Sequence, residues 1–124
     1  MASTFGSYFK GLRTKKGWTL RRFCEAKGYD PGNISRLERG VFPAPESPQK
    51  LREYARALDL KEGSDEWIEF FDRAAAARGE IPADLQADEK LVRRLPLLFR
   101  TLRGRKVTPE RLNQLVEIIR RERS

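Results

Sequence analysis

Apolar residues recur at positions i, i+3, i+4 and i+7 in five separate stretches of the chain. An α-helix has about 3.6 residues per turn, so this spacing places each quartet on one face of a helix. The two-residue alternation that is typical of half-buried strands is not sustained anywhere in the sequence. We therefore predict an all-α fold. The quartets are Phe5, Tyr8, Phe9 and Leu12; Leu51, Tyr54, Ala55 and Leu58; Trp67, Phe70, Phe71 and Ala74; Leu95, Leu98, Phe99 and Leu102; and Leu112, Leu115, Val116 and Ile119.

Start signals predict two further short helices, from about residues 19 and 30. Thr19 and Asp30 are residue types that cap helix N-termini, and Pro31 follows Asp30 where its missing N–H costs nothing. Gly28 lies where the first of these helices must end. Residues 19–40 thus contain two helices of roughly eight residues joined by a short turn, which is the layout of a helix-turn-helix.

The apolar residues of residues 19–40 fit that layout. Phe23, Cys24, Ile34 and Leu37 are predicted to face a shared core, with Cys24 as a small packing residue. Glu38 is predicted to pair with a nearby arginine or to act as a capping residue. The second helix then presents a polar face on its opposite side.

The length of 124 residues suits one small domain with an appendage. We predict a five-helix N-terminal domain over residues 1–79 and a smaller helical segment over residues 80–124. The helix boundaries within residues 83–94 stay open, because Pro96 either bends one long helix or begins a new one.

The composition excludes most classes of enzyme mechanism. The chain has no His and one Cys, so it offers no imidazole for a nucleophile pair or a zinc site and no internal disulfide. Neither a Gly-rich phosphate loop nor metal-ligand spacing is present. We expect no enzymatic activity, no metal and no cofactor. Without an apolar stretch of about 18 residues or a secretory signal, we also expect a soluble, cytoplasmic protein and no membrane partner.

The formal net charge of +8 is concentrated in two blocks. Residues 1–40 hold nine basic and three acidic side chains, and residues 90–106 hold seven basic and no acidic ones. Residues 64–89, between them, carry eight acidic and two basic groups. Solvated helix faces explain such blocks, and so does an anionic partner such as nucleic acid.

One run of residues resembles a known family. Leu12-Arg13, followed by Thr19 to Gly40 and ending Ile34-Ser35-Arg36-Leu37-Glu38-Arg39-Gly40, is similar to the signature of the lambda-repressor-like helix-turn-helix regulators, the XRE family. Ser47, Leu51, Ala55 and Leu58 fall where a fourth helix of the family lies, so the resemblance covers residues 5–62.

The resemblance implies a five-helix domain that binds double-stranded DNA. In this family the third helix enters the major groove, usually as a homodimer on a pseudo-palindromic operator. The chain would then be a transcriptional regulator, specifically a repressor, located with the nucleoid in the cytoplasm.

Carried over by position, the resemblance also implies which residues touch DNA. Arg36 is the principal candidate for a base contact, because a guanidinium can bond O6 and N7 of guanine together. Asn33 suits an adenine or a phosphate. Base contacts are expected from Gly32, Asn33, Ser35 and Arg36, and contacts to the DNA backbone from Thr19, Arg21, Arg22, Pro31, Arg39 and Phe42.

The chain departs from the family where a Gln commonly opens each of the two motif helices. Leu20 and Pro31 stand at these positions, and neither can make an amide contact. Base reading therefore shifts to Asn33 and Arg36, while Arg21, Arg22 and Lys27 add attraction to phosphates, unless these cations form an ordinary solvated helix face.

Residues 80–124 carry two apolar stripes, which predict docking on a second copy, on another protein or on the N-terminal domain. The first option makes this segment a dimerisation element. The second fits an alternative function, the antitoxin of a toxin-antitoxin pair that represses its own operon and neutralises a small toxin. The basic run in residues 90–106 extends the DNA footprint, binds an acidic protein or, as the alternative ranked last, lies on a membrane surface.

Overall fold

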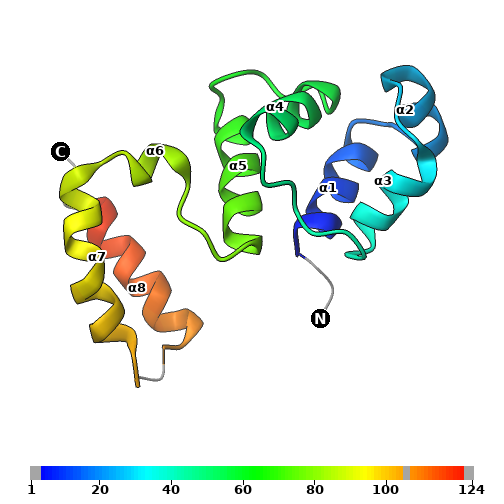
Figure 1. Ribbon diagram of the computed structural model, residues 1–124. Helices are drawn as coiled ribbons and strands as arrows, with labels where there is room; N and C mark the ends of the chain where they lie inside the picture. Colours follow the sequence, from blue (N-terminus) through cyan, green and yellow to red (C-terminus); the bar gives the residue numbers. More distant parts are fainter. Residues whose placement is uncertain (1–3, 105–106, 122–124) are drawn as a thin grey trace. The chain divides into compact units, whose positions relative to one another are not determined.

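A computed structural model of the chain describes residues 4–104 and 107–121, and every regular element within them is a helix (Figure 1). The all-α prediction is confirmed. The helices are α1 (Thr4–Lys15), α2 (Leu20–Lys27), α3 (Pro31–Glu38), α4 (Pro48–Ala57), α5 (Asp65–Ala77), α6 (Ala83–Gln86), α7 (Glu89–Leu102) and α8 (Pro109–Arg121). They fall into two compact units, of which the first ends at Ala83 and the second begins at Asp84, slightly beyond the expected boundary after Gly79.

Aromatic side chains from three helices form the centre of the first unit's core. Phe5 and Phe9 on α1, Phe23 on α2 and Phe70 on α5 are each fully buried. The ring centroid of Phe9 lies 6.0 Å from that of Phe23, edge to face, and 6.4 Å from that of Phe70. Aromatic pairs in such geometry add about 0.5–1.5 kcal/mol to the effect of burial. Through these rings α1 packs against α2 and α5.

Aliphatic side chains surround this aromatic centre. Every residue of the first three predicted quartets is buried or half-buried, as amphipathic helices require. Seven further buried apolar residues lie outside those quartets. Four of them are the residues predicted for the helix-turn-helix core, Phe23, Cys24, Ile34 and Leu37, and the other three are Ala44, Ala57 and Leu60.

The first unit depends on one very close approach between helices. A Cβ built on Gly6, in the first turn of α1, would lie 2.7 Å from the carbonyl oxygen of Glu38 and would also overlap the carbonyl oxygen of Leu37. Both oxygens belong to the last turn of α3, so the backbones of α1 and α3 meet without a side chain between them. Glycine is the residue type that permits such contact.

The second unit is a pair of longer amphipathic helices preceded by α6, a four-residue helix that the sequence did not predict. Pro96 lies inside α7, so residues 89–102 form one helix rather than two. A proline there removes the hydrogen bond to the carbonyl of Val92, one turn earlier. No described residue of this unit is buried. Its large apolar side chains that are exposed are Leu85, Val92, Leu97, Leu98, Phe99, Leu102, Val107, Leu112, Leu115, Val116, Ile118 and Ile119.

Replacing Gly6 by Ala is expected to destabilise the first unit by about 1–3 kcal/mol, the usual effect of overpacking a well-filled contact. The matched control is Gly11→Ala in the same helix, where an added Cβ meets nothing within 4 Å. Gly11→Ala should stabilise the protein slightly, because alanine favours helix over glycine by roughly 0.5–1 kcal/mol. Urea unfolding of both variants measures the difference, and equal free energies of unfolding would contradict the close approach.

Candidate nucleic-acid interface

Capping side chains set the bounds of α2 and α3, which are eight residues each. Thr19 Oγ1 accepts a hydrogen bond from the backbone N of Arg22 at 3.2 Å, and Asp30 Oδ2 accepts one from the backbone N of Asn33 at 2.9 Å. Gly28 ends α2 with φ of 77°, in the left-handed region that glycine favours. The two helix starts predicted at Thr19 and Asp30 are confirmed, and three residues separate the helices.

The two sides of α3 differ in polarity. Ile34 and Leu37 point into the core and are almost fully buried. On the other side Pro31, Asn33, Arg36 and Arg39 are exposed, and Gly32 and Ser35 are half-buried. The structure therefore gathers the predicted base-contact residues on one accessible helix face.

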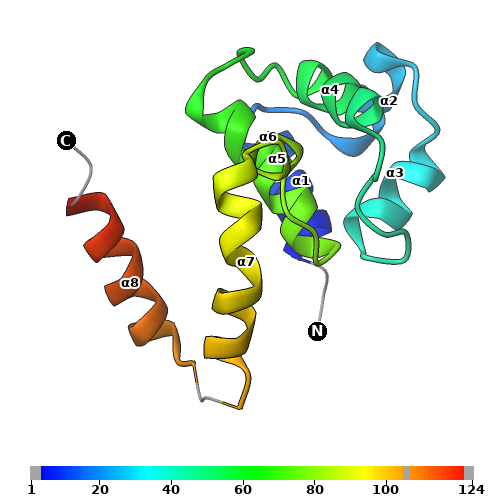
Figure 2. The ribbon, with the colours of Figure 1, turned by 60° about the vertical axis from the view of Figure 1, so that its left-hand side comes forward.

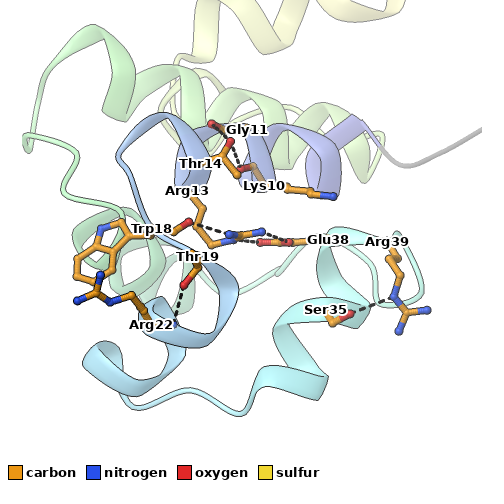
Figure 3. Close-up of polar contacts among 10 residues, drawn as sticks. All are labelled: Lys10, Gly11, Arg13, Thr14, Trp18, Thr19, Arg22, Ser35, Glu38 and Arg39. Carbon is orange, nitrogen blue, oxygen red and sulfur yellow. Dashed lines mark hydrogen bonds and ion pairs between the residues drawn. The ribbon is translucent and has the colours of Figure 1, made fainter.

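Hydrogen bonds link the polar side chains of this face in two pairs. Arg36 Nη1 donates to Asn33 Oδ1 at 3.1 Å. Arg39 Nε, just past the end of α3, donates to Ser35 Oγ at 3.1 Å (Figure 3). Each pair spans about one helical turn, the spacing at which side chains on a helix surface meet. Both guanidinium groups therefore have a preferred orientation on the surface.

A buried ion pair holds the inner side of α3 to α1. Arg13 Nε donates to Glu38 Oε2 at 2.7 Å and Nη2 donates to Oε1 at 2.9 Å, while Nη1 donates to the carbonyl oxygen of Trp18 at 2.9 Å (Figure 3). Arg13 is 5% and Glu38 9% exposed, so solvent screens the pair little. The hydrogen bond to Glu38 raises the pKa of Arg13 above its ordinary value. The prediction that Glu38 pairs with an arginine is confirmed.

Ion pairs divide the nine basic residues of residues 1–40 into two groups. Arg13 pairs with Glu38, Lys15 and Lys16 lie 3.8 and 3.5 Å from Glu66, and Lys27 lies 3.7 Å from Asp59. Within the part of the chain that the structure describes, no acidic oxygen lies within ion-pair distance of the other five. These are Lys10, Arg21, Arg22, Arg36 and Arg39, and all five are exposed.

The predicted contacts to the DNA backbone lie at the start of α2 and just after α3. Arg21 and Arg22 are exposed in the first turn of α2, and the Thr19 hydroxyl is engaged as the cap of that turn. Phe42 follows α3 and is 40% exposed. Lys27, which the sequence also offered for phosphate attraction, instead lies near Asp59, with its Nζ 5.2 Å from the Trp18 ring centroid.

Two exposed residues near this surface were not singled out from the sequence. Val41 is 59% exposed directly before Phe42, which makes the connection after α3 an apolar projection. The sequence did contain a signal for this exposed pair: two apolar residues stand between Gly40 and Pro43, where no helix can continue. Lys10 on α1 has no acidic partner among the described residues. The sequence could not distinguish it from Lys15 and Lys16, because their ion pairs with Glu66 are seen only in the structure.

The thiol of Cys24 is buried in the core of the first unit. Burial raises the pKa of the Cys24 thiol, as expected of a packing residue rather than a reactive thiolate. Within residues 4–104 and 107–121, no group of three or more acidic or Cys side chains is placed to hold a metal ion. None of the helices described is both long enough and apolar enough to cross a membrane.

Removing one partner of the buried ion pair is expected to leave an uncompensated charge in the core. Glu38→Gln should lower the free energy of unfolding by about 3–5 kcal/mol, whereas the double variant Arg13→Met/Glu38→Met should recover most of the loss. Urea unfolding monitored by tryptophan fluorescence measures both. A loss below about 1 kcal/mol, the size typical of exposed pairs, would contradict the anchoring role.

Known proteins were compared with the chain by family, by sequence and by structure. No family model matches the chain. No curated protein matches it either. Among solved structures the chain is similar to the clp gene regulator ClgR from C. glutamicum, with 29% sequence identity and a TM-score of 0.46. That likeness covers 60% of this chain and 88% of the other.

Proposed function

We propose that the chain is a sequence-specific, DNA-binding transcriptional repressor of the lambda-repressor-like, XRE type. The observation that carries this proposal is the distribution of free cations on a helix-turn-helix. Arg21, Arg22, Arg36 and Arg39 lie on α2 and at α3 without an acidic partner among the described residues, while Lys15 and Lys16 of α1 share Glu66 of α5. Unpaired arginines are the groups that displace counterions from DNA phosphates.

The shape of α3 supports the same function. The major groove of B-DNA is about 12 Å wide and admits one α-helix. The exposed face of α3 offers Asn33 and Arg36 to base edges, and Ser35 with Arg39 lies near its C-terminal end. The first turn of α2 presents Arg21 and Arg22 at a helix N-terminus, whose positive dipole end suits a phosphate. Residues on α2 thus position the protein, and residues on α3 read the sequence.

The test is selection of bound duplexes from random DNA by the full chain. We expect one motif with two half-sites and an affinity that falls as salt rises, since phosphate contacts release counterions. Recovery of only sequence-independent, salt-sensitive binding would contradict a sequence-specific regulator.

A pair of charge-matched variants sharpens this test on the selected duplex. Arg22→Ala should reduce the slope of log affinity against log salt by about one unit, because one phosphate contact is lost. Lys61→Ala removes the same charge from the connection between α4 and α5, a segment that lies away from α3 in both ribbon views (Figures 1 and 2). This control should leave the slope unchanged.

We further propose that the second unit makes the protein a homodimer. A unit of about 40 residues rarely has a stable core of its own and is usually stabilised by a partner. Ten large apolar side chains of α7 and α8 are 38–63% exposed, and burying them against a partner would remove apolar surface from water.

The pattern of α8 suits a second copy in particular. Its quartet from Leu112 to Ile119 lies at the middle of residues 109–121, so two antiparallel copies about a two-fold axis would superimpose their stripes. The same arrangement brings Glu110, in the first turn of one copy, toward Arg120 and Arg121, in the last turn of the other. Opposite charges and opposite helix dipoles then meet at both ends.

A charge placed in the stripe should separate the copies. Leu115→Glu is expected to convert the dimer to a monomer in sedimentation velocity, because two carboxylates would be buried at its centre. Gln114→Glu adds the same charge one position earlier, away from the stripe, and should leave the dimer intact. A wild-type chain that stays monomeric at tens of micromolar would contradict the homodimer, and would favour a different protein on this surface, as in the antitoxin alternative.

A further inference from the structure

We propose that Arg36 is a guanine-reading residue whose guanidinium is held in its reading position by Asn33 and Phe42 before DNA is bound. This inference rests on the proposed DNA-binding function and deepens it. It assigns one base to one side chain, and it makes Asn33 and Phe42 positioning residues instead of separate contacts. Three features of the local geometry lead to it.

The first feature is the contact between Arg36 and Asn33 on the exposed side of α3. Arg36 Nη1 lies 3.1 Å from Asn33 Oδ1. A guanidinium only donates hydrogen bonds, so the amide oxygen is the atom that faces it. Bidentate recognition of adenine would need that same oxygen as the acceptor for the adenine amino group. An Asn33 that orients Arg36 therefore has one of the two lone pairs of this oxygen already engaged, and reading adenine would make the same oxygen serve both partners.

The second feature is the turn that carries Phe42 back to Arg36. Gly40 has φ of 79°, and the chain reverses there so that the N–H groups of Val41 and Phe42 both donate to the Arg36 carbonyl oxygen, at 2.8 and 3.2 Å. The Phe42 ring centroid then lies 5.9 Å from Arg36 Cζ. A guanidinium at this distance from an aromatic ring is attracted by its electron-rich face. Phe42 thus restrains Arg36 by a second contact, made from outside the helix.

The third feature is the space that Gly32 leaves open one turn before Arg36. A Cβ at Gly32 would lie 3.3 Å from Arg36 Nη1 and 3.1 Å from Asp30 Oδ2, which is tighter than ordinary contact. With glycine in place, the guanidinium folds back over the first turn of α3. Arginine has many rotamers, and restricting them before binding lowers the entropy lost when the complex forms. Gly32, Asn33 and Phe42 together hold the N–H donors of the Arg36 guanidinium in one orientation.

The experiment measures one guanine contact in the duplex selected by the full chain. Each guanine of a half-site is replaced in turn by 7-deazaguanine, which lacks the N7 acceptor but pairs normally. The wild-type protein should lose affinity roughly 10- to 150-fold at one guanine, the range for loss of one hydrogen bond to a charged group. Arg36→Ala should bind the normal and the modified duplex equally at that position. Arg39→Ala, which removes the neighbouring arginine, should keep the difference.

Variants of the two positioning residues then separate orientation from direct contact. Asn33→Ala and Phe42→Leu should each shrink the discrimination at the Arg36 guanine and relax no other base pair. Combined with Arg36→Ala, neither should have any further effect on discrimination. Asn33→Asp keeps an acceptor oxygen and Phe42→Trp keeps an aromatic face, so both should preserve the ratio of affinities, although Asn33→Asp weakens binding to every duplex.

The opposite pattern would overturn the inference. If Asn33→Ala relaxed an adenine position and its effect added to that of Arg36→Ala, Asn33 would be an independent base contact. If Phe42→Leu left the guanine discrimination unchanged, the ring would have no positioning role. Each of these results requires a selected DNA sequence, so they remain distinct from failure of the proposed function, in which no sequence is selected. Circular dichroism of each variant confirms that the helices are retained.

Discussion

The arrangement of the first unit depends on the buried ion pair between Arg13 and Glu38. Arg13 lies near the end of α1, Glu38 is the last residue of α3, and the same guanidinium holds the Trp18 carbonyl just before α2. One side chain therefore joins both helices of the motif to α1. A buried charge is tolerated only with its partner in place, and Gly6 lets the backbones approach closely enough. Together they hold α3 against α1 and leave the opposite face of α3 exposed.

Electrostatics then gives that exposed face its chemistry. Glu66 on α5 lies near Lys15 and Lys16, and Asp59 lies near Lys27, so part of the N-terminal positive charge is paired within the fold. Among the residues that the structure describes, the basic groups of residues 1–40 without an acidic partner are Lys10 and the arginines on α2, on α3 and just after α3. The net charge of residues 1–40 alone would suggest a generally basic surface. The ion pairs reduce it to a smaller set of cations, most of which belong to the helix-turn-helix.

Local features of the sequence were sufficient for the helices and their starts, because apolar periodicity and capping are decided within a few residues. The contacts that orient the site were not, since Arg13 and Glu38 are 25 positions apart and Lys16 and Glu66 are 50 apart. Phe42 was expected at the DNA backbone, but its contact with Arg36 depends on the turn at Gly40. In the second unit the four-residue α6 was missed because one turn carries no periodicity.

Binding of DNA by the exposed face of α3 is tested directly by mapping amide chemical shifts while the isotope-labelled full chain is titrated with its selected duplex. We predict shifts concentrated in residues 31–42 and in the first turn of α2, with the amides of α5 little changed. Shifts concentrated in α7 and α8, with α3 unaffected, would contradict it and would transfer the nucleic-acid contact to the second unit.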